Sequence, residues 1–144
     1  MMKDLRPTHI AETALYVTDL DLAADFYLHI FPGAVLHRDD RLCALRVAEE
    51  QVLLLFRRGA SLQPTALPFG SIPPHDGTGS LHVCFGIGTE DVQLWEDRLK
   101  DLSIELESRV HWPGGAISLY FRDPDGHALE LATPGLWRGF PTNP

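Results

Sequence analysis

Three side chains with the chemistry of metal ligands lie far apart along this 144-residue chain. Glu12 and Glu130 carry carboxylates, and His82 carries an imidazole. Two carboxylates and a neutral imidazole balance the charge of a divalent cation and can occupy one face of an octahedron, which leaves positions for water or substrate. We therefore predict that Glu12, His82 and Glu130 hold one divalent metal ion, with Mn, Fe, Ni, Co or Zn as candidates.

The residue types alone leave other interpretations open. Both carboxylates can be solvated, or can pair with an arginine, without any metal. Glu12 can instead leave the metal and act as a general base. In that case a Glu12→Gln variant should keep its metal and lose turnover.

Strand patterns surround all three residues. Residues 10–17, 81–87 and 128–132 alternate between two kinds of side chain, as strands with one buried face do. If each half is a curved sheet with its helix outside, Glu12, His82 and Glu130 lie on the inner face. The outer face is then apolar and consists of Leu15, Val17, Val83, Phe85, Leu129 and Leu131.

The order of elements is repeated in the two halves of the chain. Residues 19–30 and 89–102 space apolar side chains as one face of a helix requires, with Thr18 and Thr89 as the expected N-caps. In the first helix this face consists of Leu22, Phe26, Tyr27 and Ile30. Strand-like runs complete the halves at 35–47, 52–56, 104–110, 117–121 and 128–132. We predict an α+β fold of two tandem βαβββ modules that form a cupped, mostly antiparallel mixed sheet with helices outside.

The length suits one domain that spans residues 1–144. We place the modules at about 9–58 and 80–134, a Pro/Gly-rich connector at 59–79 and a C-terminal tail at 135–144. The tail carries Trp137 and Phe140, and large aromatic side chains favour burial. We expect them to contact a pocket rim or a second subunit.

The segment Phe121-Arg122-Asp123-Pro124-Asp125-Gly126-His127-Ala128-Leu129-Glu130-Leu131, preceded by Ser118-Leu119-Tyr120, resembles the closing hairpin of the vicinal oxygen chelate superfamily. This superfamily includes glyoxalase I, bleomycin-resistance proteins and extradiol dioxygenases. Residues 15–20, followed by Phe26-Tyr27 and Gly33, resemble its opening strand and helix. The resemblance spans about residues 9–134.

The resemblance also implies a ligand set. The metalloenzymes of this family take ligands from the first strand of each half and from the last strand, which here gives Glu12, His82 and Glu130. Glu12 departs from the commoner histidine or glutamine. Glyoxalase I adds a ligand from the last strand of the first half, where repeat alignment places Leu54. Since leucine cannot ligate a metal, the pattern is closer to the three-ligand extradiol dioxygenases and fosfomycin-resistance transferases.

Two functions follow as hypotheses. The first is a metal-dependent enzyme whose small-molecule substrate chelates the ion through adjacent oxygens, with oxygen insertion, isomerisation, lyase chemistry and thiol transfer all open. The second is a metal-free binding protein of the bleomycin-resistance type. Under both hypotheses the candidate residues for binding the small molecule are Tyr16, Phe56, Arg57, Trp112, Ser118 and Trp137. His111 is a candidate acid or base, and Tyr120 a candidate proton donor.

The composition limits the classes of molecule that this protein can bind. A formal net charge of −8 disfavours nucleic acid, and no apolar run approaches the ~18 residues of a membrane span. The polar amino terminus does not resemble a signal peptide, and Cys43 and Cys84 form no C-x-x-C pair, so we expect a cytoplasmic protein with reduced thiols. Members of the resembled family often form homodimers, and we expect one here.

Overall fold

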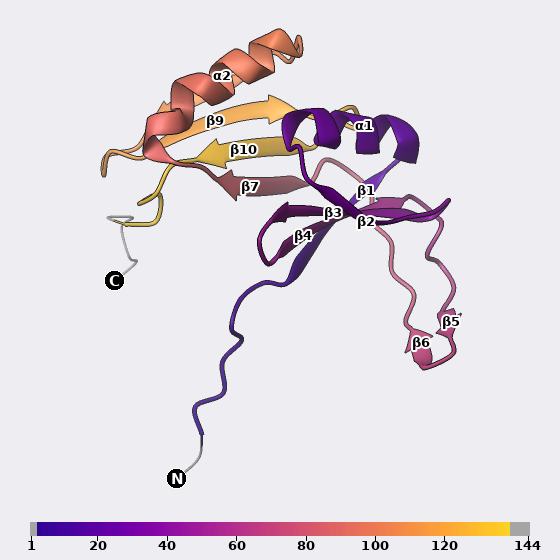
Figure 1. The fold of residues 1–144 in the computed structure, drawn as a ribbon. Helices are drawn as coiled ribbons and strands as arrows, with labels where there is room; N and C mark the ends of the chain where they lie inside the picture. Colours follow the sequence, from indigo (N-terminus) through magenta and orange to yellow (C-terminus); the bar gives the residue numbers. More distant parts are fainter. Residues whose placement is uncertain (1–2, 139–144) are drawn as a thin grey trace. The chain divides into compact units, whose positions relative to one another are not determined.

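Figure 1 shows the computed structural model of the chain, in which residues 3–138 are described. The chain divides into two compact units, Met1–Thr78 and Gly79–Pro144. Each unit contains a four-stranded mixed sheet and an α-helix, in the predicted βαβββ order. The α+β class is therefore confirmed. No helix within residues 3–138 is long and apolar enough to cross a membrane.

The first unit is built on a sheet with the strand order β1-β4-β3-β2. Strands β1 and β4 are parallel, and the other neighbouring strands are antiparallel. The elements are β1 (Glu12–Val17), α1 (Leu20–Ile30), β2 (Ala34–Arg38), β3 (Leu42–Ala48) and β4 (Gln51–Arg57).

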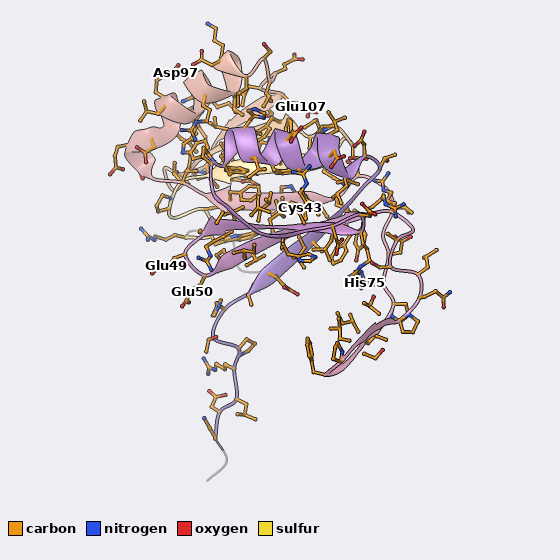
Figure 2. All side chains as sticks on the ribbon, turned by 45° about the vertical axis from the view of Figure 1, so that its right-hand side comes forward. Cys43, Glu49, Glu50, His75, Asp97 and Glu107 are labelled. Atoms are coloured by element: carbon orange, nitrogen blue, oxygen red, sulfur yellow. The ribbon has the colours of Figure 1, made fainter. Side chains whose placement is uncertain are left out.

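One face of this sheet forms the core with α1. Leu15, Val17, Leu53 and Leu55 are almost completely buried, and the thiol-bearing Cys43 of β3 lies between the sheet and α1 (Figure 2). Because successive side chains of a strand alternate, Glu12, Ala14 and Tyr16 lie on the other face of β1. The sequence pattern predicted this division of β1 correctly.

The buried face of α1 agrees with the prediction at Tyr27 and Ile30 and differs at Leu22, and its cap also differs. The buried residues are Leu20, Ala23, Ala24, Tyr27 and Ile30, whereas the side chain of Leu22 is exposed. The two alanines make the contact face because small side chains let the helix approach the sheet. The N-cap is Asp19 rather than Thr18, and its carboxylate accepts the Leu22 amide at 3.0 Å.

The second unit repeats the topology, with the strand order β7-β10-β9-β8 and one parallel pair, β7 with β10. Figure 1 shows α2 lying over one face of this sheet. Leu119, Phe121, Leu129 and Leu131 are fully buried on the sheet, and α2 buries Val92 and Leu99. The elements are β7 (His82–Gly86), the 3-10 helix η1 (Thr89–Asp91), α2 (Val92–Asp101), β8 (Ser108–His111), β9 (Ile117–Arg122) and β10 (Ala128–Ala132).

Two details of this unit also differ from the prediction. Thr89 begins η1 instead of capping α2, because a 3-10 turn precedes the α-helix. The strand expected from residue 104 begins only at Ser108, which pairs with Tyr120 of β9.

The connector contains a hairpin that the sequence pattern did not reveal. Strands β5 (Thr65–Leu67) and β6 (Gly70–Ile72) pair with each other, and Figure 1 shows them projecting on a long loop. The base of the loop is closed by a hydrogen bond from the His75 amide to the carbonyl of the buried Ser61, at 2.9 Å. Phe69 at the hairpin tip is 86% exposed.

Candidate metal centre

The central strand of the second unit positions Glu130. Strand β10 lies between β7 and β9, and Glu130 pairs with Cys84 on one side and Tyr120 on the other. His82 and Ser118 lie two residues from these partners, so strand alternation places all five side chains on one face of the sheet. Their neighbours Leu129 and Leu131 point to the core under α2 and are fully buried.

The orientation of His82 is fixed by a backbone contact. Its Nδ1 atom lies 2.7 Å from the Ala128 carbonyl oxygen. Since a carbonyl can only accept, Nδ1 carries a proton and donates it. In the neutral ring the Nε2 lone pair is then free, and Nε2 lies 3.4 Å from Oε1 of Glu130. Metal-binding histidines are held by this kind of contact at the other ring nitrogen.

The second carboxylate oxygen of Glu130, Oε2, is held by a hydrogen bond. The carboxylate is buried, with 5% of the residue exposed, and the Ser118 hydroxyl donates to Oε2 at 2.6 Å. The indole Nε1–H of Trp112 donates to the Ser118 oxygen at 2.8 Å. A buried carboxylate is costly without such partners and without a compensating positive charge.

Tyr120 and Cys84 flank this carboxylate. The Tyr120 ring is stacked beside the His82 ring, with centroids 6.5 Å apart. Burial and then the charge of Glu130 raise the pKa of Tyr120, so its phenol stays protonated at neutral pH and can donate. Burial of the sulfur and then Glu130 raise the pKa of Cys84 to about 12, which keeps this side chain a thiol.

A pocket of about 690 Å³ opens beside His82 and Glu130. Its floor is formed by β7 and β10, and residues 134–138 form a wall. The predicted binding residue Trp137 belongs to this wall and is 75% exposed. Arg138 also lines the pocket, and its guanidinium has no ion-pair partner among residues 3–138. Sequence reasoning missed Arg138, although a cation that closely follows the last ligand strand was a usable signal.

The donor set of the pair fits a first-row divalent ion. An imidazole nitrogen and a carboxylate oxygen face each other, and with the imidazole neutral both are acceptors that an interposed cation satisfies. Within neither unit do the described residues gather three or more His, Cys, Asp or Glu side chains placed for a metal. The second unit therefore supplies two of the three predicted ligands.

Glu12 belongs to the first unit and occupies the place in β1 that His82 occupies in β7. Each is the first residue of its strand, and each faces the closing strand of its module. Glu12 is exposed. The registers also match further on: Ala14 pairs with Leu54 as Cys84 pairs with Glu130, so Leu54 holds the position equivalent to Glu130.

Two of the predicted binding residues meet in the first unit. Tyr16 pairs with Phe56, and their rings are stacked with centroids 5.8 Å apart. The Tyr16 hydroxyl hydrogen-bonds Nδ1 of His75 at 2.7 Å, so the connector covers this pair. Burial and the charge of Asp76 raise the pKa of Tyr16.

The structure separates the remaining candidates from these groups. Arg57 pairs with Val17, so it lies on the sheet face opposite Tyr16, and its Nε donates to the Asp40 carbonyl at 2.9 Å. His111 pairs with Ile117 while Val110 pairs with Ser118, which puts His111 on the face opposite Glu130. Trp112 and Ser118 do not line the pocket and lie behind Glu130 instead.

Comparisons with known proteins identify the family and the fold. The sequence profile of the Glyoxalase/Bleomycin resistance protein/Dioxygenase superfamily matches residues 8–131. A relative is the metallothiol transferase FosB of Bacillus licheniformis, which is 30% identical over 122 residues that cover 84% of this chain and 72% of that protein.

Solved structures show the same fold. The lactoylglutathione lyase from Agrobacterium tumefaciens has a TM-score of 0.82 and 36% identity, over 93% of this chain and 98% of that one. The fosfomycin resistance protein FosX from Listeria monocytogenes, solved with Mn(II) and sulfate, has a TM-score of 0.67 over 91% of this chain and 94% of that one. At 23% identity the second likeness supports the fold alone. The chain belongs to the glyoxalase/bleomycin resistance protein/dioxygenase superfamily.

Proposed function

We propose that this protein is a divalent-metal-dependent enzyme that acts on a small molecule through two adjacent oxygen atoms of that molecule. The observation that carries the proposal is the approach of His82 Nε2 to Glu130 Oε1, at 3.4 Å, with the imidazole proton held on the other nitrogen. Glu12, the counterpart of His82 in the first module, is the third ligand of this proposal. When bound, the ion supplies Lewis-acid stabilisation of negative charge on the substrate oxygens.

The remaining residues of the pocket bind and orient the substrate. The protonated phenol of Tyr120 can donate to a substrate oxygen beside Glu130. The guanidinium of Arg138 favours a substrate with an anionic group, because it lines the pocket without an ion-pair partner among the described residues.

Thiol transfer is the reaction that we propose first. It is the activity in the name of the curated relative, the metallothiol transferase FosB. In such a reaction a carbon–sulfur bond forms at a carbon beside the chelating oxygens, a carbon–oxygen bond of the substrate opens, and the thiol proton ends on the released oxygen. Lyase chemistry is the second candidate, since the solved lactoylglutathione lyase is 36% identical.

One residue favours the transferase over the lyase. Leu54 lies at the register position equivalent to Glu130 and cannot bind a metal, so the fourth protein ligand that the resemblance implies for glyoxalase I is missing. Assays that measure the loss of a free thiol in the presence of fosfomycin, and the formation of lactoylglutathione, separate the two reactions.

Metal-free sequestration is the alternative. The relatives named above are enzymes, which favours catalysis. Ligand binding that survives a chelator and Glu130→Ala would support sequestration, whereas metal-dependent catalysis loses activity under both.

The first experiment is metal analysis by plasma mass spectrometry of protein purified without a histidine tag. We compare the wild type with Glu12→Ala, His82→Ala and Glu130→Ala. Asp97→Ala is the matched control, because it removes an exposed carboxylate on α2 (Figure 2) that accepts a hydrogen bond from Gln93 of the same helix. We expect near one equivalent of metal in the wild type and in Asp97→Ala, and little in the other three. The proposal is wrong if wild type and Glu130→Ala hold the same metal, or if reconstitution with Mn, Fe, Ni, Co and Zn all fails.

We further propose a homodimer and a cytoplasmic location. Large exposed aromatic side chains, Phe69 on the β5–β6 hairpin and Trp137 on the pocket wall, support an association surface. Phe140, the other aromatic predicted to join this contact, lies outside the described residues. Reduced Cys43 and Cys84 suit the cytoplasm. Sedimentation at micromolar concentration that showed only monomer would contradict the dimer.

A further inference from the structure

We propose that Ser118, oriented by Trp112, restricts Glu130 to coordination through one oxygen and thereby sets the metal preference of the site. The inference rests on the proposed function, since it concerns the same ion. It assigns Trp112 and Ser118 as positioning residues, which act through Glu130 and do not touch the substrate.

The direction of the hydrogen bonds follows from the donor chemistry. The indole Nε1–H of Trp112 can only donate, so its 2.8 Å contact with Ser118 Oγ occupies a lone pair of that oxygen. The single hydroxyl proton of Ser118 is then directed to Oε2 of Glu130, at 2.6 Å. Ser118 is fully buried, so no water competes for this proton.

The consequence concerns how the carboxylate can bind a cation. Oε2 accepts a hydrogen bond from the neutral hydroxyl of Ser118, while Oε1 faces Nε2 of His82. Turning the carboxylate so that both oxygens meet the ion would move Oε2 away from the buried Ser118 hydroxyl and weaken their hydrogen bond. Glu130 would therefore hold the ion through Oε1 alone.

One-oxygen binding discriminates between cations. Calcium takes six to eight oxygen ligands and often uses a carboxylate through both oxygens, whereas Mn, Fe, Co, Ni and Zn accept an imidazole nitrogen and a single carboxylate oxygen. The Trp112–Ser118 pair thus favours first-row transition metals over calcium.

The test measures Mn²⁺ binding by the full-length protein with electron paramagnetic resonance, and its displacement by Ca²⁺. Three variants probe the chain of hydrogen bonds from Trp112 through Ser118 to Glu130, which we call the relay. Ser118→Ala removes the hydroxyl, Ser118→Thr keeps it, and Trp112→Phe removes the indole donor while keeping an aromatic ring. Thermal unfolding in chelator shows which variants are folded.

Loss of an outer-shell partner typically lowers metal affinity by about 10- to 100-fold, which we expect for Ser118→Ala, together with a smaller preference for Mn²⁺ over Ca²⁺. Ser118→Thr should stay within about threefold of the wild type, and Trp112→Phe should change affinity in the same direction as Ser118→Ala but less. If Ser118→Ala does not fold, the Trp112→Phe ratio decides the question.

Two outcomes overturn the inference and can be told apart. If the wild type binds Mn²⁺, Glu130→Ala does not, and the hydroxyl-free variants keep the wild-type Mn²⁺/Ca²⁺ preference, then the relay has no role in selectivity although the proposed function stands. If wild type and Glu130→Ala bind Mn²⁺ equally, the proposed metal centre itself is wrong, and the inference is wrong with it.

Discussion

The Nε2 atom of His82 lies 3.4 Å from Oε1 of Glu130, and each atom is an acceptor while the Ala128 carbonyl holds the imidazole proton on Nδ1. When the imidazole is neutral, two acceptors at this distance repel each other unless a cation lies between them. Ser118 donates to the other oxygen of Glu130, and the side chains of Tyr120 and Cys84 also hydrogen-bond this carboxylate. A stabilising contribution from a bound ion is therefore expected.

Metal should stabilise the folded protein through this pair. Mn²⁺ at a hundredfold excess over its dissociation constant adds about 2.7 kcal/mol to the free energy of unfolding. We expect a clear rise in melting temperature on addition of Mn²⁺ to the wild type, measured by circular dichroism, and no rise in Glu130→Gln. The amide can still accept from Ser118, so this variant isolates the negative charge. An equal rise in both proteins would contradict the assignment of Glu130 as a ligand.

Tyr120 should affect turnover without affecting metal content. Its phenol lies beside Glu130 and keeps its proton because burial and the carboxylate raise its pKa. Removing a general acid commonly lowers a rate by about 10²- to 10⁴-fold, so Tyr120→Phe should lose at least about a hundredfold in kcat. Plasma mass spectrometry should find wild-type metal in this variant. Loss of the metal together with activity would instead make Tyr120 part of the metal shell.

The alternation of polar and apolar side chains made the topology predictable, and also the sheet face that carries His82 and Glu130. In β1 and β10 this alternation decides which residues face the helix, and it is a local property of the chain. It placed His82 and Glu130 on one face correctly, and the matched registers of the two parallel pairs explain why Leu54 aligns with Glu130.

Contacts that depend on tertiary geometry were not predictable. The pairing of Trp112 with Ser118 requires the turn between β8 and β9 to bring the indole back to the strand, which no local pattern encodes. The β5–β6 hairpin was hidden because its strands are three residues long and lie among prolines such as Pro64 and Pro68. The contribution of Ala23 and Ala24 to the buried face of α1 was missed because alanine carries little hydrophobic signal.

Stability should depend on pH through Asp39 in the turn between β2 and β3. The hydrogen bond from His37, at 2.7 Å, and then the amides of Leu42 and Arg41 lower the pKa of Asp39 from 3.8 to about 2. A carboxyl group whose pKa is lower in the folded state stabilises the fold above the unfolded pKa and loses that contribution as the pH falls through the folded pKa.

The wild type should therefore exceed Asp39→Asn in free energy of unfolding above about pH 4, and the difference should disappear between pH 3.8 and about 2. The Asp39 side chain is 44% exposed, so solvent screening keeps the difference below about 1 kcal/mol. Urea titrations at several pH values measure it. A difference that stayed constant down to pH 2 would show that the charge of Asp39 contributes nothing.

Packing of the connector on the first sheet can be tested at Gly77. A Cβ atom at this position would lie 2.4 Å from Cδ2 of the Tyr16 ring, which is held between Phe56 and the His75 hydrogen bond. The ring cannot move away without breaking these contacts, so Gly77→Ala should destabilise the protein by about 1–3 kcal/mol, as overpacking generally does. Gly86→Ala is the matched control, since a Cβ atom there would meet no atom of the described residues within 4 Å apart from its chain neighbours. Urea unfolding measures the free energy of unfolding of Gly77→Ala and Gly86→Ala. Equal values for the two variants would mean that the connector does not pack tightly against the Tyr16 ring.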